Sequence, residues 1–278
     1  MKRRFLPLAL AGLVCLTACG QRQAKEEREP EPDTLLEETA LVFDDGAVAS
    51  LWQRPYFGQK VYRLPDGTDL LTVDAPNTVD NVAVMGMEGY DALSEAAGQK
   101  VLDYFTDLGI LFDEEGELRR AYEDYCLAKD ENRDFHPHLL AQDSSPYGEN
   151  DSYLCYITSV QYPQDLRFDR TVLEDRYSVI FDKETGEVVS PWALFRVSEK
   201  QARQYVLDQI MRYYRGDPAD ADRALKEEYI FWSDRGLSID FPQGALPGEE
   251  YAWGMSIEPA ELKEVLTEKA QDFSPKEN

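Results

Sequence analysis

The stretch RYSVIFDKETGEVV, residues 176–189, decides the fold class that the sequence predicts. Its first seven residues are rich in aromatic and β-branched side chains, which is typical of a β-strand. The next four residues, KETG, are a turn signal, because Gly186 can take the left-handed backbone conformation. The last three residues lead back along the first strand, so we expect an antiparallel hairpin here.

Strand patterns recur on both sides of this hairpin. Residues 153–159 alternate between two faces, as a half-buried strand does. In the first half, the turn signals Asp45-Gly46 and Pro65-Asp66-Gly67 separate short apolar runs. Further strands are predicted at residues 40–43, 61–64, 70–73, 237–241 and 253–257.

Helical patterns lie between these strands, without the regular strand–helix–strand repeat of a parallel sheet. Apolar side chains recur at three- and four-residue steps over residues 90–108, before Gly109, and again over residues 118–126. Ser198 and Gln201 form a capping box at the start of a further helix. The chain is therefore predicted to be α+β, with a largely antiparallel sheet and helices packed on it.

The first nineteen residues have the layout of a bacterial secretion signal. Three basic residues precede an apolar run, which ends in Leu16-Thr17-Ala18-Cys19 and resembles the lipobox of lipoproteins. The run of about fourteen residues is shorter than the ~20 that a membrane-spanning helix needs. We expect cleavage after residue 18 and a palmitate-type lipid anchor at Cys19, which would hold the protein on the extracytoplasmic face of the cell membrane. The alternative is an ordinary signal peptide cut near Ala18, which would leave a free secreted protein.

Four segments are predicted along the chain. Residues 130–150 are polar and rich in turn signals, and this composition is typical of a domain boundary. The predicted segments are a lipoprotein signal peptide (1–18), a flexible tether (19–34), an N-terminal α+β region (35–145) and a C-terminal α+β domain (146–272).

The chain is strongly acidic, with a formal net charge of −25. Removal of the three basic residues with the signal takes the charge to about −28. Such a field repels nucleic acid and anionic lipid, and it raises the encounter rate of basic partners. Two interpretations stay open: the acidity keeps an exported protein soluble, or it attracts a cationic protein or peptide.

Cys126 and Cys155 are the two cysteines outside the signal and the lipobox. In an oxidising compartment they could form a disulfide. That bridge would close a loop of about thirty residues, for which the chain-entropy model gives roughly 3.5 kcal/mol. The alternative is a pair of buried free thiols, because a domain of this size does not need a disulfide to be stable.

Residues 153–266 resemble an extracytoplasmic domain of unknown function. The similarity lies in the hairpin and aromatic loop of residues 181–195 and in the closing hairpin and helix of residues 236–262. RsiV-type anti-sigma factors, which bind lysozyme, carry this domain at their C-terminus, and in the peptidoglycan deacetylase PdaC it precedes the catalytic domain. The resemblance implies a free-standing version of that outer domain, RsiV-like in fold. Residues 163–168, PQDLRF, replace a Gly-Gly-Ala-His-like turn that is usual in the family, so no ligand contact of that turn is carried over.

Catalytic and metal-binding patterns are weak in this sequence. His136 and His138 are the only histidines, and zinc usually takes three or four ligands, so we expect two surface residues and no metal or other cofactor. Neither Cys126 nor any serine lies in a nucleophile-elbow context. The carboxylates are too numerous for the sequence to single out a catalytic pair.

Aromatic side chains are the remaining candidates for ligand contact. Aromatic side chains in a mixed sheet are mostly core, and Trp192, which follows Pro191 in a predicted loop, is the one candidate for an exposed side chain that contacts a ligand. Trp253 shares a strand face with Tyr251 and Met255, which favours a place in the core.

These features predict a lipid-anchored, extracytoplasmic binding protein of the bacterial envelope. We expect it to be non-enzymatic, with no catalytic residue, and to recognise a cationic protein or a cell-wall component but not nucleic acid. Two alternatives are an enzyme that acts on cell-wall glycan through carboxylates, and an envelope scaffold lipoprotein.

Overall fold

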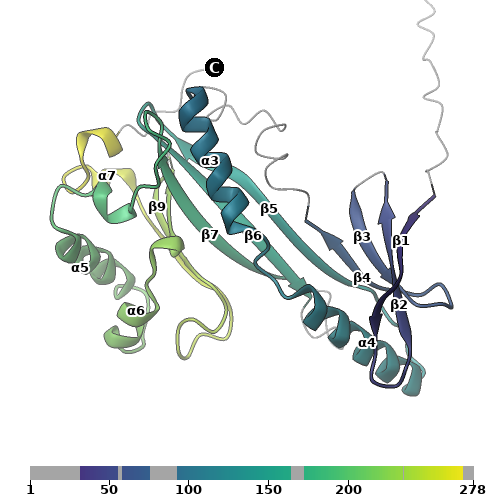
Figure 1. Ribbon diagram of the computed structural model, residues 1–278. Coiled ribbons are helices and arrows are strands. Elements are labelled where there is room, and N and C mark those ends of the chain that lie inside the picture. Colours follow the sequence, from purple (N-terminus) through teal and green to yellow (C-terminus); the bar gives the residue numbers. More distant parts are fainter. Residues whose placement is uncertain (1–31, 56–57, 76–92, 164–171, 234, 272–278) are drawn as a thin grey trace, which may run out of the picture. The chain divides into compact units, whose positions relative to one another are not determined.

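The largest element of the fold is a seven-stranded sheet (Figure 1). The computed structural model describes residues 32–55, 58–75, 93–163, 172–233 and 235–271. The strands lie in chain order, and every neighbouring pair is antiparallel except β4 and β5, which are parallel. Their bounds are β1 (Thr34–Val42), β2 (Val48–Arg54), β3 (Gln59–Arg63), β4 (Asp69–Asp74), β5 (His138–Glu149), β6 (Tyr153–Pro163) and β7 (Val172–Asp182).

Among the described residues between β4 and β5, two helices cover this sheet, as Figure 1 shows. The first, α3 (Glu95–Leu108), begins where the Ser94 hydroxyl accepts from the Ala97 backbone N–H, and it ends before Gly109, as predicted. The second, α4 (Glu114–Asp130), follows after a short connection. α3 packs on β6 and β7, and α4 packs on β4 and β5.

A three-stranded antiparallel sheet packs against β5, β6 and β7. It consists of β8 (Ile230–Ser233), β9 (Gly236–Phe241) and β10 (Trp253–Ile257), in the order β10-β9-β8. Helices and 3-10 turns surround it: η1 (Pro191–Leu194), α5 (Glu199–Ile210), α6 (Pro218–Ala224), η2 (Glu227–Tyr229), α7 (Pro259–Leu262) and η3 (Glu268–Ala270). The predicted capping box of Ser198 and Gln201 is present at the start of α5. The α+β class and the largely antiparallel sheet are confirmed.

The described residues form three hydrophobic clusters between these layers. One joins α4 to β2–β5 around Leu70, Leu118 and Leu140, and a second joins α3 to β6 and β7 around Phe105 and Tyr156. The third and largest joins the small sheet and α5 to β6 and β7, with Ile180, Val206, Trp232, Leu237 and Leu262 among its members. No helix of the described residues is long and apolar enough to cross a bilayer.

Strand β5 runs across residue 145, where the sequence predicts a domain boundary. This strand runs from His138 to Glu149, pairs with β4 on one side and with β6 on the other, and so carries the sheet across the position where a break was expected. Residues 32–278 accordingly form one compact unit. The polar side chains of residues 142–145 misled the prediction because two of them are satisfied inside the sheet. Ser144 hydrogen-bonds Thr158, and the Gln142 amide donates to the Gly109 carbonyl.

Candidate functional site

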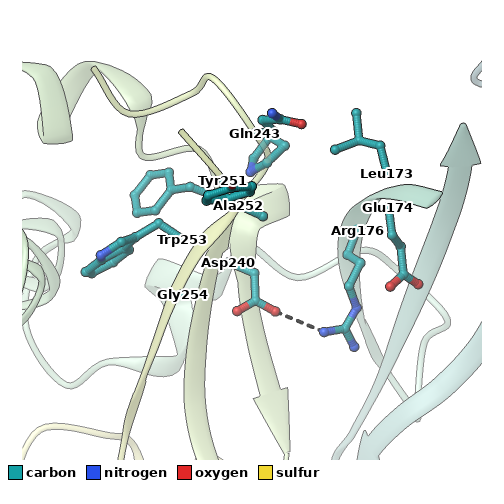
Figure 2. Close-up of a pocket in the computed structure, with 11 residues that line it drawn as sticks. Leu173, Glu174, Arg176, Asp240, Gln243, Tyr251, Ala252, Trp253 and Gly254 are labelled. Atoms are coloured by element: carbon teal, nitrogen blue, oxygen red, sulfur yellow. Dashed lines mark hydrogen bonds and ion pairs between the residues drawn. The ribbon is translucent and has the colours of Figure 1, made fainter. Parts of the chain in front are cut away.

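A cleft of about 500 Å³ opens between β7 and the β9–β10 hairpin (Figure 2). Leu173, Glu174 and Arg176 of β7 form one wall, and residues 240–243 and 251–254 form the other. Its volume is within the range of small-ligand sites. The walls come from two different sheets, so the cleft exists only because the small sheet packs on the large one.

An ion pair between Asp240 and Arg176 crosses the cleft. Arg176 Nη1 donates to Asp240 Oδ2 at 3.1 Å, and each side chain is about one-third exposed, at 36% and 32% respectively. Gly254 lies opposite Asp240 in the β9–β10 register, and a Cβ added there would lie 2.5 Å from Asp240 Oδ1. The glycine therefore leaves the room that the carboxylate needs to reach across the cleft.

Aromatic rings hold the guanidinium of Arg176 in place. Its Cζ lies 5.5 Å from the ring centroid of Phe231 on β8 and 5.9 Å from that of Tyr147 on β5. Each contact is in the range of a cation–π interaction, which is stronger at sites partly shielded from water. Arg176 is thus fixed by both sheets, and it orients Asp240 in turn.

The electrostatics of the cleft favour a cation. Burial raises the pKa of Asp240 above its usual value; the charge of Arg176 opposes this shift and that of Glu174 adds to it. Glu174 is exposed at the edge of the cleft. The carboxylates of Glu174 and Asp240 outnumber the single guanidinium of Arg176, so the lining keeps a net negative charge. A second positive group in the cleft would therefore stabilise the ionised form of Asp240.

Two aromatic side chains border the charged part of the cleft. Tyr251 is 67% exposed, and Trp253 is half-buried, with its ring centroid 5.9 Å from that of Phe241. Trp253 packs against the largest hydrophobic cluster, as its place on a strand predicts, and it also lines the cleft together with Tyr251. The lining residues include no histidine, serine, threonine or cysteine, so the available chemistry is binding through charge and aromatic surface, or acid–base chemistry of the two carboxylates.

Trp192 is buried, and the expectation that it is exposed is wrong. It is 4% exposed and lies in η1, where the Ser190 hydroxyl accepts from its backbone N–H at 3.3 Å. Arg203 covers its ring at 5.8 Å. Ser190 as N-cap followed by Pro191 was a local signal for a short helix in place of the predicted loop.

The two cysteines are free thiols in the structure, so the disulfide that the sequence leaves open is not formed. Cys155 lies on β6 in the largest hydrophobic cluster, and burial raises the pKa of its thiol to about 12. Cys126 lies on α4, the helix that packs on β4 and β5. Cys19 falls outside the described residues.

His138 is not the surface residue that the sequence predicts. It is 1% exposed, with Nδ1 2.6 Å from Glu117 and Nε2 3.0 Å from Asp124, both on α4. His136 is exposed, as expected. Within the described residues no group of three or more histidine, cysteine or acidic side chains is arranged to hold a metal ion. The two carboxylates of α4 therefore use His138 to fasten the helix to β5.

No protein-family model matches the chain, and a comparison with curated proteins finds no match. Solved structures that are similar to it include two members of the DUF3298 family, a domain of unknown function. The protein from Bacteroides fragilis has 10% identity and a TM-score of 0.42, over 86% of this chain and 100% of its own. The one from Pseudomonas aeruginosa has 10% identity and a TM-score of 0.35, over 87% and 97%. At this identity and TM-score the likeness is distant and says nothing about a ligand.

Proposed function

We propose that this chain is a lipid-anchored, extracytoplasmic binding protein of the bacterial envelope that holds a cationic protein or peptide in the cleft between β7 and the β9–β10 hairpin. The observation that carries the proposal is the lining of that cleft. Glu174 and Asp240 outnumber the single Arg176, and the exposed ring of Tyr251 lies at the same opening.

The whole-chain charge supports the same class of partner. A net charge of −25 attracts basic proteins over long distances, and this attraction weakens as salt shortens the screening length. Long-range attraction alone would select any basic molecule. The aromatic side chains and the fixed Arg176–Asp240 pair supply the short-range contacts that could select one.

Export and anchoring belong to the proposal on the strength of Leu16-Thr17-Ala18-Cys19. Two acyl chains hold a protein on a bilayer where one chain would not. We propose in addition that residues 153–266 form an RsiV-like domain, as their resemblance implies. Metabolic labelling with palmitate should mark the wild type and not Cys19→Ala, and the variant should leave the membrane fraction. Equal labelling of both proteins would contradict the anchor.

A matched pair of charge reversals tests the cleft. Glu174 in the cleft and Glu123 on α4 are both exposed glutamates, so Glu174→Lys and Glu123→Lys change the net charge equally. We expect Glu174→Lys to weaken binding of lysozyme or a cationic peptide about tenfold or more, and Glu123→Lys to change it less than about threefold. The measurement is calorimetry on the full chain at low and high salt. Equal effects of the two variants, or no salt-sensitive binding at all, would overturn the proposed site.

The raised pKa of Asp240 also favours one alternative, an enzyme that acts on cell-wall glycan. A glycoside hydrolase uses one carboxyl group as an acid and a second as a base or nucleophile, and Glu174 lies in the same cleft. The chain can be incubated with peptidoglycan and the products examined by mass spectrometry. Product release that is lost in both Glu174→Gln and Asp240→Asn would assign catalysis in place of binding.

A further inference from the structure

The edge of β7 borders the cleft, and only part of that edge is covered. β6 pairs with β7 along its whole length, from Val172 to Asp182. On its other edge, the C-terminal end of β7 is hydrogen-bonded to residues 187–189, which follow the turn. The Val189 N–H donates to the Ile180 carbonyl at 2.8 Å, and the Asp182 N–H donates to the Glu187 carbonyl at 3.0 Å. Of the described residues, those at 172–176 pair with no strand but β6.

The middle of β7 is covered by the small sheet and the turn before it. The Ser178 hydroxyl donates to the Ile230 carbonyl at the start of β8, and Tyr177 lies beside Tyr229 of η2, with 6.2 Å between ring centroids. The small sheet still contacts the side chain of Arg176, through Phe231 and Asp240, and the cleft begins there. The free stretch of edge and the wall of the cleft are therefore the same segment.

A free strand edge is a template for another chain, and native proteins protect such edges with charged side chains. The free stretch of β7 carries three consecutive charged residues, Glu174, Asp175 and Arg176. They discourage pairing with an ordinary apolar strand. A segment that places basic side chains opposite Glu174 and Asp240 would meet no such penalty.

We infer that the cationic partner binds in extended form, as an added strand beside residues 172–176 of β7. The inference rests on the proposed function and deepens it. Five strand residues span ~17 Å, enough for a short peptide segment to pair through its backbone. Alternate side chains of that segment point into the cleft, where its basic groups meet Glu174 and Asp240 and its aliphatic stems lie against Tyr251 and Trp253.

Backbone methylation of a probe peptide tests this without altering the protein. The probe is a seven-residue peptide of alternating lysine and valine, with blocked ends, titrated into the full chain. Two derivatives carry N-methyl groups on alternate residues, one on the odd positions and the other on the even positions. An added strand pairs with β7 through one edge only, so we expect one derivative to bind about tenfold or more weakly and the other to bind within about threefold of the parent.

Hydrogen exchange gives a second readout on the protein itself. We expect the parent peptide to slow amide exchange in the segment 172–176 and to leave β2, which is distant in the chain and lines no part of the cleft, unchanged. Equal binding of both methylated derivatives, together with unchanged exchange in β7, would overturn strand addition. If that binding still depended on Glu174, the proposed function would survive; if no cationic probe bound at all, both would fail.

Discussion

At the scale of single residues, the hydrogen-bond partners of a side chain depend on which distant residues the fold brings close to it. His138 is adjacent to Leu139 in a polar stretch, and nothing in its own neighbourhood marks it as buried. Its ring nitrogens face two carboxylates that lie fourteen and twenty-one positions earlier. Both ring nitrogens of His138 therefore lie within hydrogen-bond distance of a carboxylate oxygen.

Loss of the His138 ring should destabilise the protein. His138→Ala leaves Glu117, which is 10% exposed, beside Asp124 without the intervening donor, although Arg120 still contacts Glu117 at 2.9 Å. We expect a loss of about 2–3 kcal/mol in the free energy of unfolding, measured in urea. His136→Ala is the control, because His136 is exposed and should change stability by less than about 0.5 kcal/mol. Equal losses in the two variants would contradict the role of His138.

Asp240 should make binding depend on pH. Its pKa is raised above 3.8 chiefly by burial, and a bound cation favours the ionised form. Affinity for a lysine-rich peptide should therefore be full above the raised pKa and fall as the pH drops through it. The sign for stability is the opposite: the folded state holds this proton more tightly, so the contribution of Asp240 to stability decreases as the pH rises through the same window.

The measurement is calorimetric titration of the peptide from pH 7 down to pH 4 in wild type and in Asp240→Asn. The variant should bind more weakly at pH 7 and lose the part of the pH dependence that Asp240 contributes. Superimposable pH profiles for the two proteins would show that Asp240 takes no part in binding.

At the scale of elements, local signals placed most helices and strands. The capping box at Ser198, the stop at Gly109 and the hairpin turn at Gly186 are local features, because each depends on residues within one turn of chain. Gly186 has a positive φ of 71°, and a Cβ there would lie 2.3 Å from the Ala97 carbonyl oxygen. The turn therefore also serves as a contact between the hairpin and α3, which no local pattern could reveal.

We expect the short helix η1 to contribute to the free energy of unfolding mainly through the ring of Trp192. Trp192 is 4% exposed, so Trp192→Ala should cost about 3–5 kcal/mol in the free energy of unfolding, as large-to-small changes in cores do. Tyr251→Ala, at a side chain that is 67% exposed, should change stability by less than about 0.5 kcal/mol but weaken peptide binding. A small effect of the first variant would show that the ring is not packed as described.

At the scale of the whole molecule, β5 ties the two halves of the chain into one sheet. It pairs in parallel with β4 from the first half and antiparallel with β6 from the second, so neither half has a complete sheet alone. Unfolding should therefore be one cooperative transition, although the hydrophobic side chains form three clusters.

Tryptophan fluorescence can test this because the four tryptophans are unevenly placed. Trp52 lies on β2, and the other three, Trp192, Trp232 and Trp253, lie in the second half. In Trp52→Phe, fluorescence reports on the second half alone, whereas far-ultraviolet circular dichroism reports on the entire chain. We expect both signals to change with the same urea midpoint. Separate midpoints would restore the predicted division near residue 145.

The sequence alone determined what depends on neighbouring residues: the α+β class, most helices and strands but not β2 or β5, the capping box and the glycine turns. The sequence is also the sole basis for the predicted lipid anchor at Cys19, which lies outside the described residues. Only the tertiary structure decided where the cleft lies, because the residues of its two walls, on β7 and on the β9–β10 hairpin, are more than sixty positions apart in the sequence. It likewise turned Trp192 inward, brought Tyr251 to the cleft and buried His138. The physical reason is that burial and charge pairing are set by contacts distant in sequence, and one sequence without that packing cannot report them.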